Sequence, residues 1–157
     1  MPPRPGRHRS VARNEIHIDA RPEAVFSVLS DAEAYGDWVV GSRRIRDADP
    51  DFPAVGSRFH HQVGVPPLVL NDHTEVLESE NPSRLVLRAK TRPFATARVE
   101  LRLVPDGSGT RVVMFEGAGD LPSRLVLNPL TDPLVHARNS RSLQRLRRLC
   151  EGVASSR

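Results

Sequence analysis

Hydrophobic and polar residues alternate in several short stretches of this chain, a two-residue period that is typical of β-strands with one buried face. The first stretch, residues 11–18, places Ile16 and Ile18 on the same face. The clearest stretch, residues 95–104, sends alanine, valine and leucine to one side and arginine and glutamate to the other. Five further segments are expected to be strands, namely residues 42–48, 58–65, 69–79, 84–91 and 110–117. Because the turns between successive strands are short, these strands are expected to form an antiparallel meander.

The period lengthens to three and four residues in two regions, which is typical of helices with one buried face. Residues 19–30 carry such a stripe, and Pro22 suits the first turn of a helix because its missing N–H costs nothing there. Asp31 is a good N-cap for a second, short helix that runs to about Tyr35. Residues 131–153 carry the longest stripe and predict a C-terminal helix.

Positive charge gathers in two parts of the chain. The net charge is +4 and the pI is near 10.4, yet Lys90 is the only lysine. Arginine dominates residues 1–10 and residues 138–148, where it lies mostly off the apolar stripe of the last helix. Acidic residues are spread between these two parts, so no stripe of one sign is evident across the whole fold. This pattern argues against a nucleic-acid partner, since net charge by itself does not identify a partner.

The length fits one domain, because 157 residues can bury one sizeable core but not two. Residues 1–10 are basic and rich in proline, and we expect a disordered tail there, followed by a single domain over residues 11–153. No apolar run approaches the ~20 residues of a membrane-spanning helix, and no apolar segment follows the basic start as in a secretory signal. Cys150 is the only cysteine, so no disulfide can form within the chain. We therefore expect a cytoplasmic protein.

Several short motifs fall in a recognisable order along the chain. They are residues 16–28 (IHIDARPEAVFSV), 30–38 (SDAEAYGDW), 56–59 (GSRF), 74–77 with 81–87 (NPSRLVL), and 109–112 (GTRV). With these motifs the chain resembles the SRPBCC (START-like, helix-grip) superfamily, and looks closest to its bacterial polyketide cyclase/dehydrase-like branch. The resemblance implies an α+β helix-grip fold: a curved seven-stranded antiparallel sheet wraps around the long C-terminal helix, and two short helices join strands one and two. It does not select a function, because lipid carriers, hormone receptors and aromatic cyclases share this fold.

The binding site implied by this fold is the space between the sheet and the last helix. A strongly bent sheet cannot fill its own concave face, and a helix across the opening leaves an apolar cavity that suits a small molecule. The residues expected to line it are Trp38, Phe59, His61, Leu87, Val99, Leu101, Met114 and Asn139. Asn139 lies on the apolar stripe of the last helix, where a buried amide needs partners, so it either binds a ligand oxygen or ties the helix to a strand backbone.

Candidate catalytic residues lie on the third and fourth strands. His61 is expected to face inward, and His73 and Glu75 share one face of the fourth strand. If that face is inward, either residue could form with His61 an acid–base pair for dehydrating or cyclising a β-keto substrate. In the other orientation of the strand, Thr74 and Val76 face inward and the pair does not form. The alternation of this strand does not decide between the two.

These observations favour a binding protein, more than an enzyme, for a hydrophobic or amphipathic small molecule such as a polyketide, lipid or isoprenoid, which it could also transport. One alternative is a cofactor-independent cyclase or dehydratase that uses a His/Glu pair. The other is a module that contacts RNA or a protein through the arginine-rich last helix. No cofactor is expected, because the glycines form no phosphate-binding pattern. No metal is expected, because the histidine spacings match no zinc pattern and no cysteine pair exists.

Overall fold

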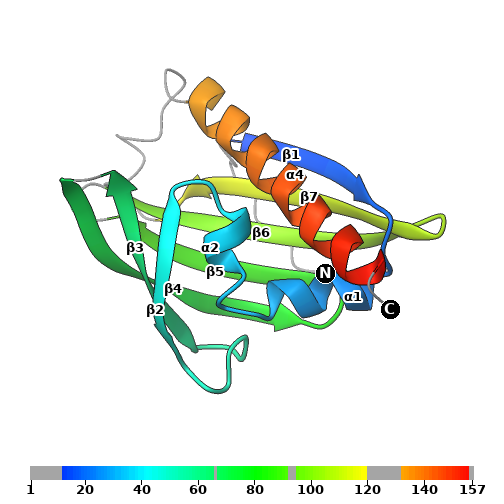
Figure 1. The fold of residues 1–157 in the computed structure, drawn as a ribbon, viewed down its shortest axis with the longest axis horizontal. Coiled ribbons are helices and arrows are strands. Elements are labelled where there is room, and N and C mark those ends of the chain that lie inside the picture. The colour runs from blue at the N-terminus through cyan, green and yellow to red at the C-terminus, as the bar shows by residue number, and fades with distance from the viewer. Residues whose placement is uncertain (1–11, 66, 92–94, 120–131, 156–157) are drawn as a thin grey trace, which may run out of the picture.

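The computed structural model of the protein describes residues 12–65, 67–91, 95–119 and 132–155. The tail expected over residues 1–10 and most of the loop expected before the last helix lie outside the described residues. Within them the chain forms a seven-stranded sheet in the order β1-β7-β6-β5-β4-β3-β2, with helices packed on one side of it (Figure 1).

All neighbouring strands of this sheet are antiparallel. The edges are β1 (Ala12–Ile18) and β2 (Ser42–Ala48). The strands between them are β3 (Arg58–Val65), β4 (Leu68–Glu80), β5 (Arg84–Thr91), β6 (Ala95–Asp106) and β7 (Gly109–Ala118). Strands β2 to β6 each pair with the next strand along the chain, whereas β1 pairs with β7, so that Ala12 lies opposite Glu116. The antiparallel meander and the α+β class are therefore confirmed.

Two helices connect β1 to β2. α1 (Pro22–Leu29) begins with its proline in the first turn, as expected, and buries one side against the sheet. α2 (Tyr35–Trp38) begins where the sequence predicts the second helix to end. The reason is local, because Asp31 Oδ1 accepts a hydrogen bond from Glu33 N at 3.0 Å and holds a turn in front of the helix.

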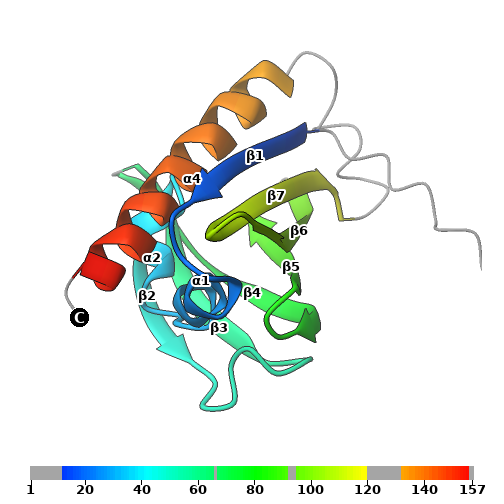
Figure 2. The ribbon, with the colours of Figure 1, turned by 90° about the vertical axis from the view of Figure 1, so that its right-hand side faces the viewer.

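The sheet is strongly curved. Irregular register in β2, and in β4 between Val76 and Glu78, marks bulges, which bend a strand and increase its twist. Seen end-on in Figure 2, the strands curl so that α1 lies on their inner side and α4 (Asp132–Ser155) runs beside β1 across the opening. The long helix also contacts α1 and α2, so the helices and the inner face of the sheet enclose one interior.

That interior holds the hydrophobic core. Leu143, Leu146 and Cys150 of α4 pack into one cluster with side chains of α1, α2 and the inner sheet face. Burial raises the pKa of the Cys150 thiol to about 12, so it stays protonated. No helix in the described part of the chain is both long enough and apolar enough to cross a membrane.

The outer face of the sheet carries charge that is partly buried. β6 alternates as predicted, with Leu101 and Leu103 inward and Glu100 on the other side. Glu100 is nevertheless only 2% exposed, because the long side chains of Arg84 and Arg102 cover it. Its carboxylate accepts hydrogen bonds from Arg102 Nε at 2.6 Å and Arg84 Nε at 2.9 Å, which offsets the cost of burying the charge.

Candidate functional site

An aromatic cluster lies where α2 meets β3. The ring centroids of Tyr35 and Trp38 are 5.0 Å apart, and those of Tyr35 and Phe59 are 4.6 Å apart. Phe52 packs edge-on against Phe59 at 5.3 Å, and the His61 ring follows on β3 at 5.5 Å from Phe59. Tyr35 and Trp38 are three residues apart in α2, so both side chains lie on the side of this short helix that is buried.

Three polar atoms of this cluster are buried without a hydrogen-bond partner. They are Tyr35 Oη, Trp38 Nε1 and His61 Nδ1, and their residues are only 3%, 1% and 6% exposed. The great majority of buried polar atoms in proteins are hydrogen-bonded, and a buried group that lacks a partner costs about 1–3 kcal/mol. Three such atoms belong to one group of neighbouring rings, and this makes the aromatic cluster the candidate binding site.

His61 is held in a fixed position by β4. Its Nε2 is hydrogen-bonded to Thr74 Oγ1 at 3.0 Å, which leaves Nδ1 as a donor or an acceptor according to the tautomer. Burial lowers the pKa of His61, and the opposing effect of Asp72 is smaller. The ring is therefore neutral at pH 7 and offers one free nitrogen.

The orientation of β4, which the sequence leaves open, is settled by burial and register. Thr74 and Val76 are buried, and Thr74 pairs with the inward-facing Phe59, so these residues face the interior. His73 and Glu75 lie on the opposite face. There Glu75 accepts a hydrogen bond from an arginine of β5, and this bond lowers its pKa.

The structure therefore brings neither His73 nor Glu75 to His61. The ring of His73 instead lies 5.9 Å from that of His60, on the outer side of the sheet. An acid–base pair of His61 with either residue, which requires them on one face, is not formed. In the described residues, no group of three or more histidine, cysteine or acidic side chains comes together as it would around a metal ion.

Asn139 belongs to a second polar group, between α4 and the sheet. Its Nδ2 donates to Glu116 Oε2 at 2.7 Å, and Arg138 Nη2 contacts both oxygens of the same carboxylate at 2.5 Å. Asn14 of β1 donates to the backbone oxygen of His136 at 3.0 Å. Asn139 thus ties the helix to a strand, through a side chain of β7 where the sequence suggests a backbone partner. Glu116 is not among the residues predicted from the sequence. It follows Met114 by two residues on β7, however, and this spacing places both side chains on the same face of the strand.

The apolar residues expected to line the site form the inner face of the sheet. Leu87, Leu101 and Met114 are buried in the core cluster, and Val99 packs against it partly buried. Val99 lies opposite Glu116 in the β6–β7 pairing. The apolar side chains of β5, β6 and β7 therefore lie between the aromatic cluster at β3 and the polar group at α4.

The fold recurs in solved structures. Protein NE0264 from Nitrosomonas europaea is similar with a TM-score of 0.69 and 17% identity, over 90% of this chain and 94% of that one. A STAR-related lipid transfer protein from Xanthomonas axonopodis gives a TM-score of 0.62 and 18% identity, over 92% of this chain and 89% of the fragment 25–204 solved there. At these identities the likeness establishes the fold alone.

A third similar structure comes from a biosynthetic pathway. The di-domain ARO/CYC protein StfQ from the steffimycin biosynthetic pathway has a TM-score of 0.71 and 10% identity. The match covers 92% of this chain and 51% of that chain, which carries two domains.

Comparison by sequence gives one family. No curated protein matches the chain. The sequence profile of the family described as "Polyketide cyclase / dehydrase and lipid transport" matches residues 10–151, nearly the whole chain. The chain therefore belongs to the polyketide cyclase/dehydrase and lipid transport family of the SRPBCC superfamily.

Proposed function

We propose that the protein binds an uncharged amphipathic small molecule, such as a polyketide, lipid or isoprenoid, between the inner face of its sheet and α4. The observation that carries this proposal is the set of three buried, unpartnered polar atoms in the aromatic cluster, Tyr35 Oη, Trp38 Nε1 and His61 Nδ1. The surrounding core residues offer an apolar surface to the body of the ligand, at roughly 25 cal/mol per Å² buried.

The polar end of the ligand is an oxygen acceptor. Trp38 Nε1 can only donate, and Tyr35 Oη can donate while it also accepts. Burial raises the pKa of Tyr35, so its hydroxyl stays protonated and keeps its donor. A carbonyl or hydroxyl oxygen satisfies these donors, whereas neutral donors do not offset the cost of burying a carboxylate or a phosphate.

The two acid–base pairs that the sequence suggests for His61 are not formed, because His73 and Glu75 lie on the other side of the sheet. The titratable group opposite His61 on the inner face is the buried Asp72, whose charge opposes the lowering of the His61 pKa. His61 then acts as a neutral hydrogen-bonding group that positions the ligand. Transport of the ligand between two sites is an extension of this binding function.

A matched series of ligands tests the proposal. 2-Acetylnaphthalene carries a ketone oxygen, 2-ethylnaphthalene has nearly the same shape without it, and 2-naphthoate carries a carboxylate. Trp38 is the only tryptophan, so quenching of its fluorescence by 2-acetylnaphthalene reports binding at this cluster directly. The other two ligands are measured by displacement of the ketone and by the thermal shift that each produces.

We expect the ketone to bind about 5–10-fold more tightly than the hydrocarbon, the value of one added hydrogen bond, and the carboxylate to bind most weakly. Native mass spectrometry of the protein purified from its own host is expected to show a bound small molecule. The proposal fails if no member of the series quenches Trp38 or raises the melting temperature, and the native mass is that of the chain alone.

A further inference from the structure

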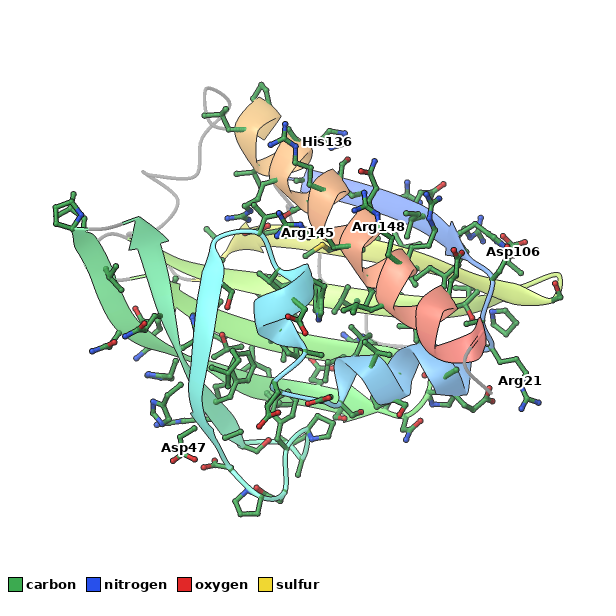
Figure 3. The ribbon with its side chains drawn as sticks, viewed as in Figure 1. Arg21, Asp47, Asp106, His136, Arg145 and Arg148 are labelled. Carbon is green, nitrogen blue, oxygen red and sulfur yellow. The ribbon has the colours of Figure 1, made fainter. Side chains whose placement is uncertain are left out.

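The side of α4 that faces away from the sheet carries a line of exposed arginines. Arg141, Arg145 and Arg148 are exposed and follow one another at spacings of four and three residues, which places them along one line of the helix. Figure 3 labels two of them, Arg145 and Arg148, on this helix. We call these three residues the arginine stripe.

Three arginines of the sheet differ from the arginine stripe. Arg84, Arg98 and Arg102 each pair with a carboxylate of the outer face, at distances of 3.5 Å or less. By contrast, no described side chain forms an ion pair with the arginine stripe. Among the described residues the stripe is therefore a surface of positive charge, and such a surface attracts an acidic partner.

We propose that the arginine stripe docks the protein on an anionic lipid surface. Arginine beside a membrane that contains acidic lipids is attracted to the headgroups within a Debye length. Leu134 lies seven residues, two helical turns, before Arg141 on the same line of α4 and is 74% exposed. A large apolar side chain at the end of a cationic line fits a bilayer interface, where it can enter the headgroup region beside the arginines.

Two other kinds of contact fit the surface less well. Single-stranded nucleic acid is bound by arginine together with aromatic side chains on which bases stack, and α4 contains no phenylalanine, tyrosine or tryptophan. Insertion of the helix into the bilayer would require its apolar face, and that face is occupied by the core through Leu143, Leu146 and Cys150. The contact is therefore electrostatic and reversible, and it does not depend on the ligand proposed above.

Vesicle sedimentation tests this docking. The full chain is mixed with vesicles of phosphatidylcholine, with and without phosphatidylglycerol, at increasing sodium chloride. We expect binding only to the vesicles with the anionic lipid, and a steep loss of binding as salt rises. The triple variant Arg141→Gln/Arg145→Gln/Arg148→Gln is expected to lower the partition coefficient roughly a hundredfold, because each arginine contributes about fivefold.

A matched variant separates the stripe from net charge. Arg21→Gln/Arg111→Gln/Arg147→Gln also removes three exposed arginines, two of them outside α4 and Arg147 on another side of that helix. Glutamine has nearly the helix propensity of arginine, and circular dichroism verifies that both variants fold. We expect the matched variant to keep most of the vesicle binding.

The outcomes that overturn the proposal are equal losses in the two triple variants, equal binding to vesicles with and without phosphatidylglycerol, or tighter binding to single-stranded RNA than to anionic vesicles at the same salt. Leu134→Gln adds a second readout. It is expected to weaken vesicle binding and leave the salt dependence unchanged, since it removes apolar contact and no charge.

Discussion

Buried hydroxyl groups in this protein are of two kinds. Thr110 Oγ1 is fully buried and donates to the backbone oxygen of Ala20 at 2.7 Å. Tyr35 Oη is buried to a similar degree and has no partner. A partnered hydroxyl stabilises the folded state, whereas an unpartnered one costs its desolvation without return. We therefore expect removal of the hydroxyl oxygen to change the stability of the folded state in opposite directions at these two residues.

Tyr35→Phe is expected to leave the free energy of unfolding of the ligand-free protein unchanged or raise it by about 1 kcal/mol, because it removes an unsatisfied polar atom and keeps the ring. The same change is expected to weaken binding of 2-acetylnaphthalene by about 5–10-fold, because it removes a donor to the ketone. Urea denaturation and quenching of Trp38 fluorescence measure the two effects on the same samples.

Thr110→Val is the control for this prediction. It removes a partnered hydroxyl far from the aromatic cluster, so it is expected to destabilise by about 1–3 kcal/mol and leave ligand affinity unchanged. If Tyr35→Phe destabilises the free protein as much as Thr110→Val does, Tyr35 Oη has a partner in solution and is not free to donate to a ligand.

Part of the aromatic cluster is predictable from the sequence. Trp38, Phe59 and His61 were predicted to line the interior from their positions on alternating or amphipathic segments, and all three are buried. That their polar atoms lack partners could not be predicted. A missing hydrogen bond depends on every group that the fold brings near, and those groups come from α2, β3 and β4 together.

At the scale of elements, the strands β4, β5 and β6 are joined on their outer side by a network of ion pairs. Glu100 of β6 lies at its centre, next to Arg84 of β5 and Arg102 of its own strand. Burial by itself would raise the pKa of Glu100, but the hydrogen bonds from Arg102 and Arg84 outweigh it and lower the pKa to about 2. A carboxyl group with a lower pKa in the folded state contributes stability that is present above the unfolded pKa of about 4.5.

The protein is therefore expected to lose stability as the pH falls from about 4.5 towards 2, because Glu100 must then take up a proton and release its arginines. Glu100→Gln is expected to be less stable by about 1–3 kcal/mol at pH 7 and to lose less stability over this acid range. The urea midpoint measured as a function of pH compares the variant with the unchanged chain.

Glu15→Gln serves as the comparison for this pH dependence. Glu15 forms an ion pair with Arg13 at 2.7 Å, but both side chains are largely exposed. Such pairs contribute about 0–1 kcal/mol, so the acid profile is expected to stay close to that of the unchanged chain. If Glu100→Gln loses as much stability over the acid range as the unchanged chain does, the loss comes from other carboxylates.

The sequence predicts the elements of the fold apart from two points. It places the second helix too early, because Asp31 is a good capping residue, and in the structure this residue caps a turn instead. β4 could not be oriented because histidine, threonine, glutamate and valine alternate there without a clear apolar side. Pairing with the inward Phe59 decides its orientation, and register of this kind is a property of two strands together.

At the scale of the whole molecule, α4 is held to the sheet by apolar packing and by polar contacts, among them the buried bond from Asn139 to Glu116. Asn139→Ala removes the bond from Nδ2 to Glu116 and leaves a buried carboxylate oxygen with one donor fewer. We expect it to lower the free energy of unfolding by about 1–3 kcal/mol, measured by urea denaturation. Gln144→Ala removes an exposed amide from the same helix and is expected to change stability by less than about 0.5 kcal/mol.

Equal effects of the two substitutions would mean that the contact between Asn139 and Glu116 does not hold the helix.

The sequence predicted the architecture itself, because strand alternation, the last amphipathic stripe and the order of motifs all agree on one fold. It could not predict Glu116 as the partner of Asn139. That contact joins residues 23 positions apart whose meeting depends on where the helix crosses the sheet.

The pairing of the first strand with the last has a consequence for biosynthesis. β2 to β6 can form hairpins as they leave the ribosome, whereas β1 has no strand to join until Gly109 and the residues after it have emerged. Until then a nascent chain presents the open backbone of β1 and the apolar side of Ile18 to the cell. Chaperone binding during translation is therefore expected to concentrate on the first strand and to end when β7 closes the sheet.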